Sequence, residues 1–417
     1  MLSIIILVFE ILFLKLFTEP NNGASNSLSF FLIALFSFGF FLDISRSEKR
    51  EPIRNPLVLG YLFRLFLVFF DLFGRHIYQL PNSGADSEWF YQQGVFFAQG
   101  ISASTNGFIR LVALMIGVVG SSRLFLQFLL MLTSLVSILC IDESLSLLNI
   151  DNSKRRTAVT FMAVLPNYAI LSSIFLRESL VAMCIAISIL CFIRWWTYRR
   201  EFSFLLSFAA AFVGAFFHSG VVSVALGLII VRLMCNKDRQ NVSISFRSIV
   251  AAIIFMFIFV YLYNNYTSTL FDKMQGIDAI EDVSNNSSLG DASYASIAGN
   301  SNTPVNMVIY TPIRMIMFQF APFFWQIRGI SDIIAMVFDS FFFMLVYYRT
   351  IKYIRYRIQD NRAIIIALLV IGLCTTFVFG WGVANFGTAL RHRNKMMAIY
   401  GILLGLTMPS YEKNYPE

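Results

Sequence analysis

The apolar residues of this chain fall in blocks of about 15–25 residues that are separated by short charged breaks. A helix needs about 20 consecutive apolar residues to cross the hydrocarbon core of a bilayer, so this pattern is typical of a polytopic membrane protein. Only 13% of the residues are charged and 57% are apolar, which leaves too little polar surface for a soluble globular fold. A membrane β-barrel would alternate over segments of about 10 residues. We therefore predict an all-α transmembrane bundle.

The blocks and the positive charges between them predict the topology. We expect about twelve spans, two re-entrant or interfacial helices at 107–120 and 306–327, and one integral membrane domain over residues 1–417. With twelve spans, 20 Lys or Arg residues face the side that holds both termini and 7 face the other side, so both termini are predicted to be cytoplasmic. The blocks long enough to cross are 2–17, 28–43, 56–73, 122–140, 157–175, 179–196, 202–217, 219–235, 248–263, 332–348, 363–380 and 395–409.

Two long polar stretches are then expected on the outer side, at 74–106 and 264–305. The second is rich in Asn, Ser, Gly and Asp, and we predict an external, periplasmic loop or lid there. The net charge of +8 comes from Lys and Arg in the breaks, so it reports membrane orientation and predicts no nucleic-acid partner. The five cysteines form no CxxC pair, and neither a metal site nor a cofactor fingerprint is found.

Placing an ionisable side chain at membrane depth costs free energy, so each such residue is expected to have a structural or functional role. The cluster that contains Arg391 and Arg393 precedes the last predicted span. Because arginine binds phosphate in a bidentate manner, we interpret it as an anion site, and a basic anchor for lipid headgroups is the alternative. Thr311-Pro312 predicts a helix start that places Arg314 in the first turn, where a bound anion would offset its charge. The alternative for Arg314 is a buried partner, Asp339 or Asp71.

Three further predicted outer turns carry candidate acids and bases. Arg177-Glu178 lies between two spans and predicts a phosphate ligand beside a base, or a plain helix start. His218 lies at another turn, where an imidazole serves as a general base or as a hydrogen-bonded helix end. Asp86 precedes an aromatic run that suits either sugar rings or the membrane interface. Arg64 and Asp71 lie seven residues apart in one predicted span, and we expect them to form an internal salt bridge.

In these features the sequence resembles the Wzy-type O-antigen and polysaccharide polymerases of bacterial inner membranes. The resemblance implies transfer of a growing glycan from undecaprenyl diphosphate to another lipid-linked repeat unit on the periplasmic face. The related O-antigen ligases share the architecture and the arginine chemistry. The features that carry the resemblance are Asp86 before the aromatic run, Phe175-Leu-Arg177-Glu178, Phe217-His218, the long outer loop before Arg314, and Gly387-Thr-Ala-Leu-Arg391-His-Arg393.

Our hypothesis from the sequence is a metal-independent glycosyltransferase without a cofactor. Arg314, Arg391 and Arg393 would hold the donor diphosphate, Arg177 would hold the acceptor lipid or share that task, and arginines would stabilise the leaving group in place of a metal. Glu178, His218 or Asp86 would take the acceptor proton, and the sequence leaves that choice open. Expected partners are lipid-linked donor and acceptor glycans, membrane lipids and a chain-length regulator protein. The rivals are a ligase, a transferase with a lipid-monophosphate sugar donor, and a flippase or transporter.

Overall fold

The computed structural model describes residues 1–417 except for 18–25, 102–105, 236–303, 357–360, 384 and 410–417. In the described residues every regular element is a helix and no β-strand is present. The all-α prediction is therefore confirmed for this part of the chain. The predicted span 248–263 and almost all of the predicted outer loop 264–305 lie outside the described residues.

The described residues form two compact units, and each is described here by itself. The first unit comprises Met1–Asp142 and Asp151–Met183. The prediction of a single membrane domain stays a prediction. The helices of this unit are α1 (Leu2–Phe17), α2 (Asn26–Arg46), the 3₁₀ helix η1 (Glu48–Ile53), α3 (Arg54–Phe73), α4 (Ala85–Ala98), α5 (Gly107–Val119), most of α6 (Arg123–Leu147), α7 (Asn152–Val164), α8 (Pro166–Ser173) and the start of α9 (Glu178–Tyr198).

The second unit comprises Glu143–Ile150 and Cys184–Glu417. It includes the rest of α6 and α9. Its other helices are α10 (Glu201–Phe217), the 3₁₀ helix η2 (Ser219–Val221), α11 (Val222–Met234), α15 (Pro304–Phe320), the 3₁₀ helix η3 (Phe324–Gln326), α16 (Ile330–Ile334), the π-helix η4 (Ala335–Ser340), α17 (Phe341–Tyr356), α18 (Arg362–Trp381), α19 (Phe386–Lys395) and α20 (Met397–Thr407).

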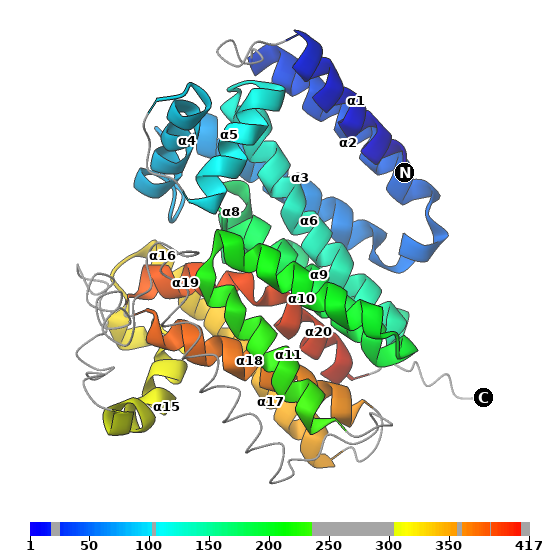
Figure 1. Cartoon of the computed structure of the whole chain (residues 1–417), viewed down its shortest axis with the longest axis vertical. Helices are drawn as coiled ribbons and strands as arrows, with labels where there is room; N and C mark the ends of the chain where they lie inside the picture. The colour runs from blue at the N-terminus through cyan, green and yellow to red at the C-terminus, as the bar shows by residue number, and fades with distance from the viewer. Residues whose placement is uncertain (18–25, 102–105, 236–303, 357–360, 384, 410–417) are drawn as a thin grey trace. The chain divides into compact units, whose positions relative to one another are not determined.

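Pairs of adjacent helices build the first unit. In Figure 1, α1 and α2 run side by side as a hairpin, and α4 packs on α5. The side chain of Asp43 accepts hydrogen bonds from the backbone N–H groups of Leu2 and Ser3, at 2.9 and 2.7 Å, and so caps the start of α1. Helix α3 packs against α7 and α8. A Cβ atom at Gly94 of α4 would lie 2.3 Å from Val112 of α5, so glycine permits this close approach.

Close helix packing also positions the elements of the second unit that matter below. Helix α18 packs against both α11 and α15. A Cβ atom at Gly227 of α11 would lie 2.7 Å from the Cα atom of Ile371, and one at Gly380 would lie 3.4 Å from the carbonyl oxygen of Arg314. The backbones of these helices therefore approach each other where glycine has no side chain. All eleven residues of α20 are buried, so α20 is a core helix of this unit.

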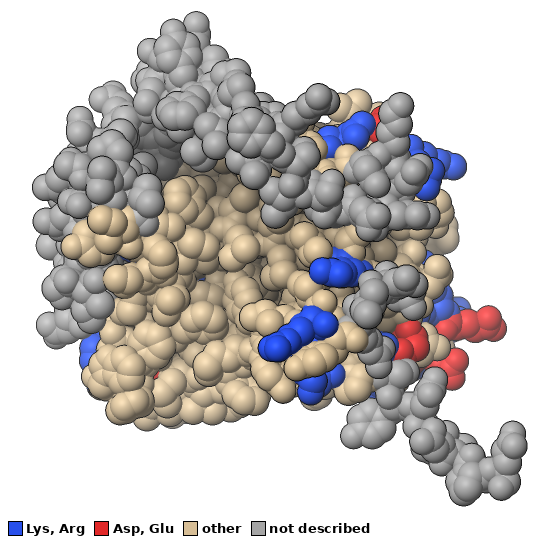
Figure 2. Space-filling model, turned by 90° about the horizontal axis from the view of Figure 1, so that it is seen from below, with Lys and Arg blue, Asp and Glu red and all other residues tan. Residues whose placement is uncertain are grey.

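Six helical segments in the described residues are long and apolar enough to cross a membrane. Four further apolar helices have 10–17 residues. A membrane protein with several spans is thus supported, whereas the predicted count of about twelve is not confirmed. Most of the described surface seen in Figure 2 is uncharged, as expected for helices that face lipid. The six candidate spans are Asn26–Arg46, Glu48–Phe73, Arg123–Leu147, Glu178–Tyr198, Ile330–Tyr356 and Arg362–Trp381.

One predicted span is interrupted in the structure. The predicted span 157–175 is divided into α7 and α8 because Pro166 begins α8 and Leu165 before it is extended, with ψ at 115°. Periodic apolar patterns do not reveal such breaks when the residues on both sides of the break are apolar.

Candidate functional site

A cluster of two histidines, a lysine and a phenylalanine lies in the second unit; we call it the histidine cluster. It consists of His218, Phe379, His392 and Lys395. The Nε2 atoms of His218 and His392 are 3.1 Å apart, and Lys395 Nζ lies 3.5 Å from His392 Nδ1. The Phe379 ring contacts both imidazoles edge-on, with centroid distances of 5.5 Å to His218 and 5.0 Å to His392. Residues from three separate parts of the chain therefore meet here.

Local structure explains how each histidine reaches the cluster. His218 lies between α10 and η2, as the C-cap of the first and the N-cap of the second. Its extended backbone turns the chain between these helices. A Cβ atom at Gly220 would lie 2.4 Å from the Phe379 ring, so this glycine allows η2 to approach α18. His392 and Lys395 lie three residues apart on α19 and thus on one helix face. Lys395 is fully buried, whereas both histidines are half-buried.

The contact between the two imidazoles constrains their protons. At an Nε2···Nε2 distance of 3.1 Å one ring donates and the other accepts. Which ring carries the proton of this contact depends on the tautomers of the two imidazoles. The Lys395 ammonium adds a positive charge next to His392 and lies over the Phe379 ring, 5.7 Å from its centroid. This arrangement is suited to moving a proton beside an anion.

Arg314 is buried on the neighbouring helix α15, with 3% of its surface exposed. Its guanidinium lies over the Trp381 ring of α18, 4.2 Å from the ring centroid, which is a close cation–π contact. The Trp381 indole N–H donates a hydrogen bond of 3.0 Å to Thr311 Oγ1. Arg314 is thereby held between two packed helices, with its planar face covered by an aromatic ring.

The predicted helix start at Thr311-Pro312 is wrong. Helix α15 begins at Pro304, so Pro312 lies inside the helix and Arg314 lies in its second half. A proline within a helix removes one backbone hydrogen bond, and membrane helices tolerate this when neighbouring helices pack around them. Arg314 is therefore not at a helix start, and a bound anion is not needed there to offset the helix macrodipole. What distinguishes Arg314 is its burial and its place beside α18.

Arg391 and Arg393 lie in the second half of α19, with Arg393 in its last turn, and the helix begins after the N-cap residue Asn385. The Asn385 side chain accepts a hydrogen bond of 2.8 Å from the backbone N–H of Gly387. Arg393 is fully buried, and it donates to the backbone carbonyls of Gln319, at 2.9 Å, and of Ala321. Arg393 thus ties α19 to the end of α15. Arg391 is half-buried.

The charges on these helices are strongly unequal. Helices α15, α18 and α19 contain no Asp or Glu, and Arg314, Arg391, Arg393 and Lys395 lie on α15 and α19. The remaining arginine, Arg362, begins α18 at the opposite end from Phe379. Cations at the end of α19 are favoured by the helix macrodipole, yet burial of Arg393 and Lys395 still costs hydration energy. The neighbouring η4 carries the fully buried Asp339. This part of the second unit is therefore rich in donors that suit an anionic oxygen ligand.

A second group of charged residues lies in the first unit, around the turn from α3 to α4. The fully buried Asp71 carboxylate accepts hydrogen bonds from Arg75 at 3.1 Å, Ser83 at 2.5 Å and Gln127 at 2.9 Å. The Glu88 carboxylate bridges Arg75 and Arg123. We call Asp71, Arg75, Glu88 and Arg123 the carboxylate–arginine network. The negative charges of the two carboxylates balance the positive charges of the two arginines. Their contacts hold the turn from α3 to α4 in place.

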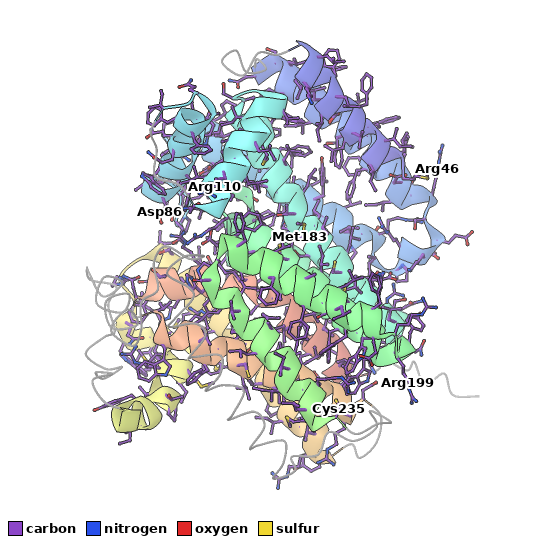
Figure 3. The ribbon with its side chains drawn as sticks, in the orientation of Figure 1. Arg46, Asp86, Arg110, Met183, Arg199 and Cys235 are labelled. Carbon is purple, nitrogen blue, oxygen red and sulfur yellow. The ribbon has the colours of Figure 1, made fainter. Side chains whose placement is uncertain are left out.

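Asp86 lies on the first turn of α4, beside this network, and its side chain is exposed (Figure 3). Glu178 begins α9 and is 2% exposed, which agrees with the predicted acidic residue at a helix start. The Arg177 guanidinium lies 5.6 Å from the centroid of the Phe90 ring on α4. Asp86, Arg177 and Glu178 thus all belong to the first unit.

The predicted salt bridge between Arg64 and Asp71 is wrong. Asp71 belongs to the carboxylate–arginine network, whereas the fully buried Arg64 binds α7 and α8. The Arg64 guanidinium donates to the carbonyls of Met162, at 2.9 Å, and Ala163, at 2.7 Å. These carbonyls face the break before Pro166, which has no N–H to donate back to Met162. Arg64 therefore supplies the donors that the proline removes.

Of the seven candidate residues, the structure groups His218, Arg314, Arg391 and Arg393 in the second unit and Asp86, Arg177 and Glu178 in the first. His392 and Lys395 were not candidates by themselves. The three-residue spacing between them on one basic helix was the available signal. No protein-family model, no curated protein and no solved structure matches this chain.

The carboxylate–arginine network predicts a pH-dependent stability. Burial raises the pKa of Glu88, but hydrogen bonds and charges from Arg75 and Arg123 outweigh this and lower it below 4.5. A lowered folded-state pKa stabilises the fold above the unfolded value, and this stabilisation is lost as the pH falls through the folded pKa. We expect Glu88→Gln to reduce the unfolding temperature at pH 7, by an amount worth less than about 1 kcal/mol because the side chain is partly exposed. The difference should close at the acidic end of a series from pH 7 to pH 3. A difference that is constant with pH would contradict this role.

Proposed function

We propose that this protein is a glycosyltransferase that polymerises oligosaccharide repeat units linked to undecaprenyl diphosphate, on the periplasmic face of a bacterial inner membrane. The observation that carries the proposal is the concentration of guanidinium, ammonium and imidazole groups on three packed helices that contain no carboxylate. A diphosphate is the ligand that such a donor set suits best. The apolar spans agree with a substrate that carries a lipid chain.

The proposed reaction assigns a role to each group. The acceptor hydroxyl oxygen forms a bond to the anomeric carbon of the donor as the bond from that carbon to the diphosphate breaks, with inversion. The diphosphate leaves with the electron pair, and Arg314 and Arg391 stabilise its charge. The acceptor proton passes to the histidine pair, His218 and His392. Arg393 positions α19 against α15 through its two carbonyl contacts.

The first-unit candidates have separate roles in the proposal. Arg177 contacts the acceptor lipid, and Glu178 and Asp86 are the alternative bases. A transferase with a lipid-monophosphate donor would use the neighbouring carboxylates Asp86 and Glu88, but Glu88 already binds Arg75 and Arg123. This contact favours the diphosphate reaction. Both termini are proposed to be cytoplasmic, with a chain-length regulator as a partner protein.

A gene deletion read on a surface-glycan gel tests the proposal. We expect loss of the ladder with one repeat unit still attached to the core, and restoration by the unchanged chain. Arg314→Ala and Arg391→Ala should restore no ladder, because one lost donor to a developing anion costs about 10²–10³-fold in rate. The control is Arg110→Ala, an exposed arginine on α5 (Figure 3), which should restore it.

Other gel patterns would contradict the proposal that this protein is a polymerase. Loss of every repeat with long lipid-linked polymer would indicate the ligase. Short intermediates trapped on the inner leaflet would indicate the flippase. Restoration by both arginine variants would remove the roles of Arg314 and Arg391.

A further inference from the structure

The first unit contains a polar cavity that the proposed reaction does not use. It lies between two walls: the end of η1 together with the start of α3, and the first turns of α7. Its volume is about 490 Å³, and it is open to the outside, because most of its lining residues are exposed. The lining combines one carboxylate, one guanidinium, two amides, one hydroxyl and one proline ring. These residues are Glu51, Pro52, Asn55, Asn152, Ser153 and Arg156.

The cavity lies at the ends of two candidate membrane spans. The span Glu48–Phe73 begins at the cavity, and the span Asn26–Arg46 ends two residues before it begins (Arg46 is labelled in Figure 3). The end of a span lies at the boundary between hydrocarbon and water. Polar pockets at that boundary, beside Lys and Arg, are where membrane proteins bind lipid headgroups. We therefore expect this cavity to lie at the level of the headgroups.

A buried ion pair fixes one wall of the cavity. Arg155 is 7% exposed and forms a bidentate contact with Asp142 of α6, with two N···O distances of 2.9 Å. The same guanidinium donates a hydrogen bond of 3.0 Å to the side chain of Asn152, which lines the cavity. On the opposite side Arg54 donates to the carbonyl of Ser45 at 3.0 Å. The α7 wall and the η1–α3 wall are thus each held by hydrogen bonds from an arginine that does not itself line the cavity.

We propose that this cavity binds the zwitterionic headgroup of phosphatidylethanolamine. Arg156 contacts the phosphate, and Glu51 accepts hydrogen bonds from the primary ammonium. The amides of Asn55 and Asn152 and the Ser153 hydroxyl contact the remaining oxygens. The lining carries one charge of each sign. A glycerol headgroup carries the same phosphate but offers Glu51 no positive charge, and a choline headgroup has no N–H to donate. This proposal does not depend on the reaction proposed above.

Native mass spectrometry of the delipidated full chain tests this proposal. Dioleoyl phosphatidylethanolamine, phosphatidylcholine and phosphatidylglycerol are added at equal concentrations. We expect the ethanolamine lipid to bind about tenfold more tightly than either of the others, because one charge-assisted hydrogen bond contributes about that factor. Arg156→Gln and Glu51→Gln should each remove most of this preference. Glu51→Gln should also improve binding of phosphatidylglycerol.

The control is Lys154→Gln, which removes a cation from the same turn of α7 outside the cavity lining. It should leave the preference unchanged. Equal binding of the ethanolamine and choline lipids to the unchanged chain would overturn the proposal without any variant. A preference for phosphatidylglycerol, or an ethanolamine preference that survives Glu51→Gln in folded protein, would also overturn it.

Discussion

Replacing His218 by Ala is expected to slow glycan extension by about 10²–10⁴-fold, the contribution of a positioned general base. The physical reason is the imidazole pair, in which His218 and His392 share one proton at an Nε2···Nε2 distance of 3.1 Å. His392→Ala should slow the reaction by a similar factor, because the proton then has no second ring to reach. The measurement is the initial rate of extension by purified protein with a lipid-linked repeat unit.

His392→Gln separates proton transfer from positioning. A glutamine amide keeps a hydrogen bond to His218, but it cannot take up the proton. We expect the Gln variant to be about as slow as the Ala variant. Recovery of most of the rate by His392→Gln would show that His392 only orients His218. His76, the remaining histidine of the chain, provides the control: it is exposed in the first unit, and His76→Ala should retain full activity.

The second large effect is expected on stability, from Arg64→Met. This change removes the donors to the carbonyls of Met162 and Ala163 and to the Ser172 hydroxyl. Each unsatisfied buried group costs about 1–3 kcal/mol, so we expect a loss of about 3–5 kcal/mol in the free energy of unfolding. Unfolding by sodium dodecyl sulfate in mixed micelles, followed by circular dichroism, measures this loss.

Two further variants serve as comparisons for the stability loss expected from Arg64→Met. Arg64→Lys keeps one charge but cannot reach several acceptors with a planar fork, so it should recover only part of the loss. Arg110→Met changes an exposed arginine on α5 and should leave the free energy of unfolding within about 0.5 kcal/mol. A loss below about 1 kcal/mol for Arg64→Met would show that the break before Pro166 does not need these donors.

The apolar blocks predicted the helical class because length and hydropathy act locally along the chain. The breaks inside the blocks were not predictable in the same way. Pro166 ends α7 while the apolar pattern continues across it, whereas Pro312 leaves α15 intact. Arg64 satisfies the carbonyls at the first break, and a distant side chain of this kind cannot be read from local sequence.

The candidate site was predictable residue by residue but not as a set of contacts. Charged residues are rare in an apolar chain and costly at membrane depth. The sequence therefore predicts His218, Arg314 and the basic cluster at 391–395 as candidate site residues. The pairing of His218 with His392 joins residues 174 positions apart, and no spacing rule reaches that far. Arg64 and Asp71 failed as a pair because the face they share meets better partners on other helices.

Incubation of the purified chain in proteoliposomes with a synthetic undecaprenyl-diphosphate-linked repeat unit tests whether the protein polymerises such units. We expect a ladder of glycans that differ by one repeat unit, with one free undecaprenyl diphosphate released for each bond formed. Arg314→Ala should abolish both products together. Movement of intact lipid-linked units across the bilayer, with no new glycosidic bond and no free diphosphate lipid, would contradict the account.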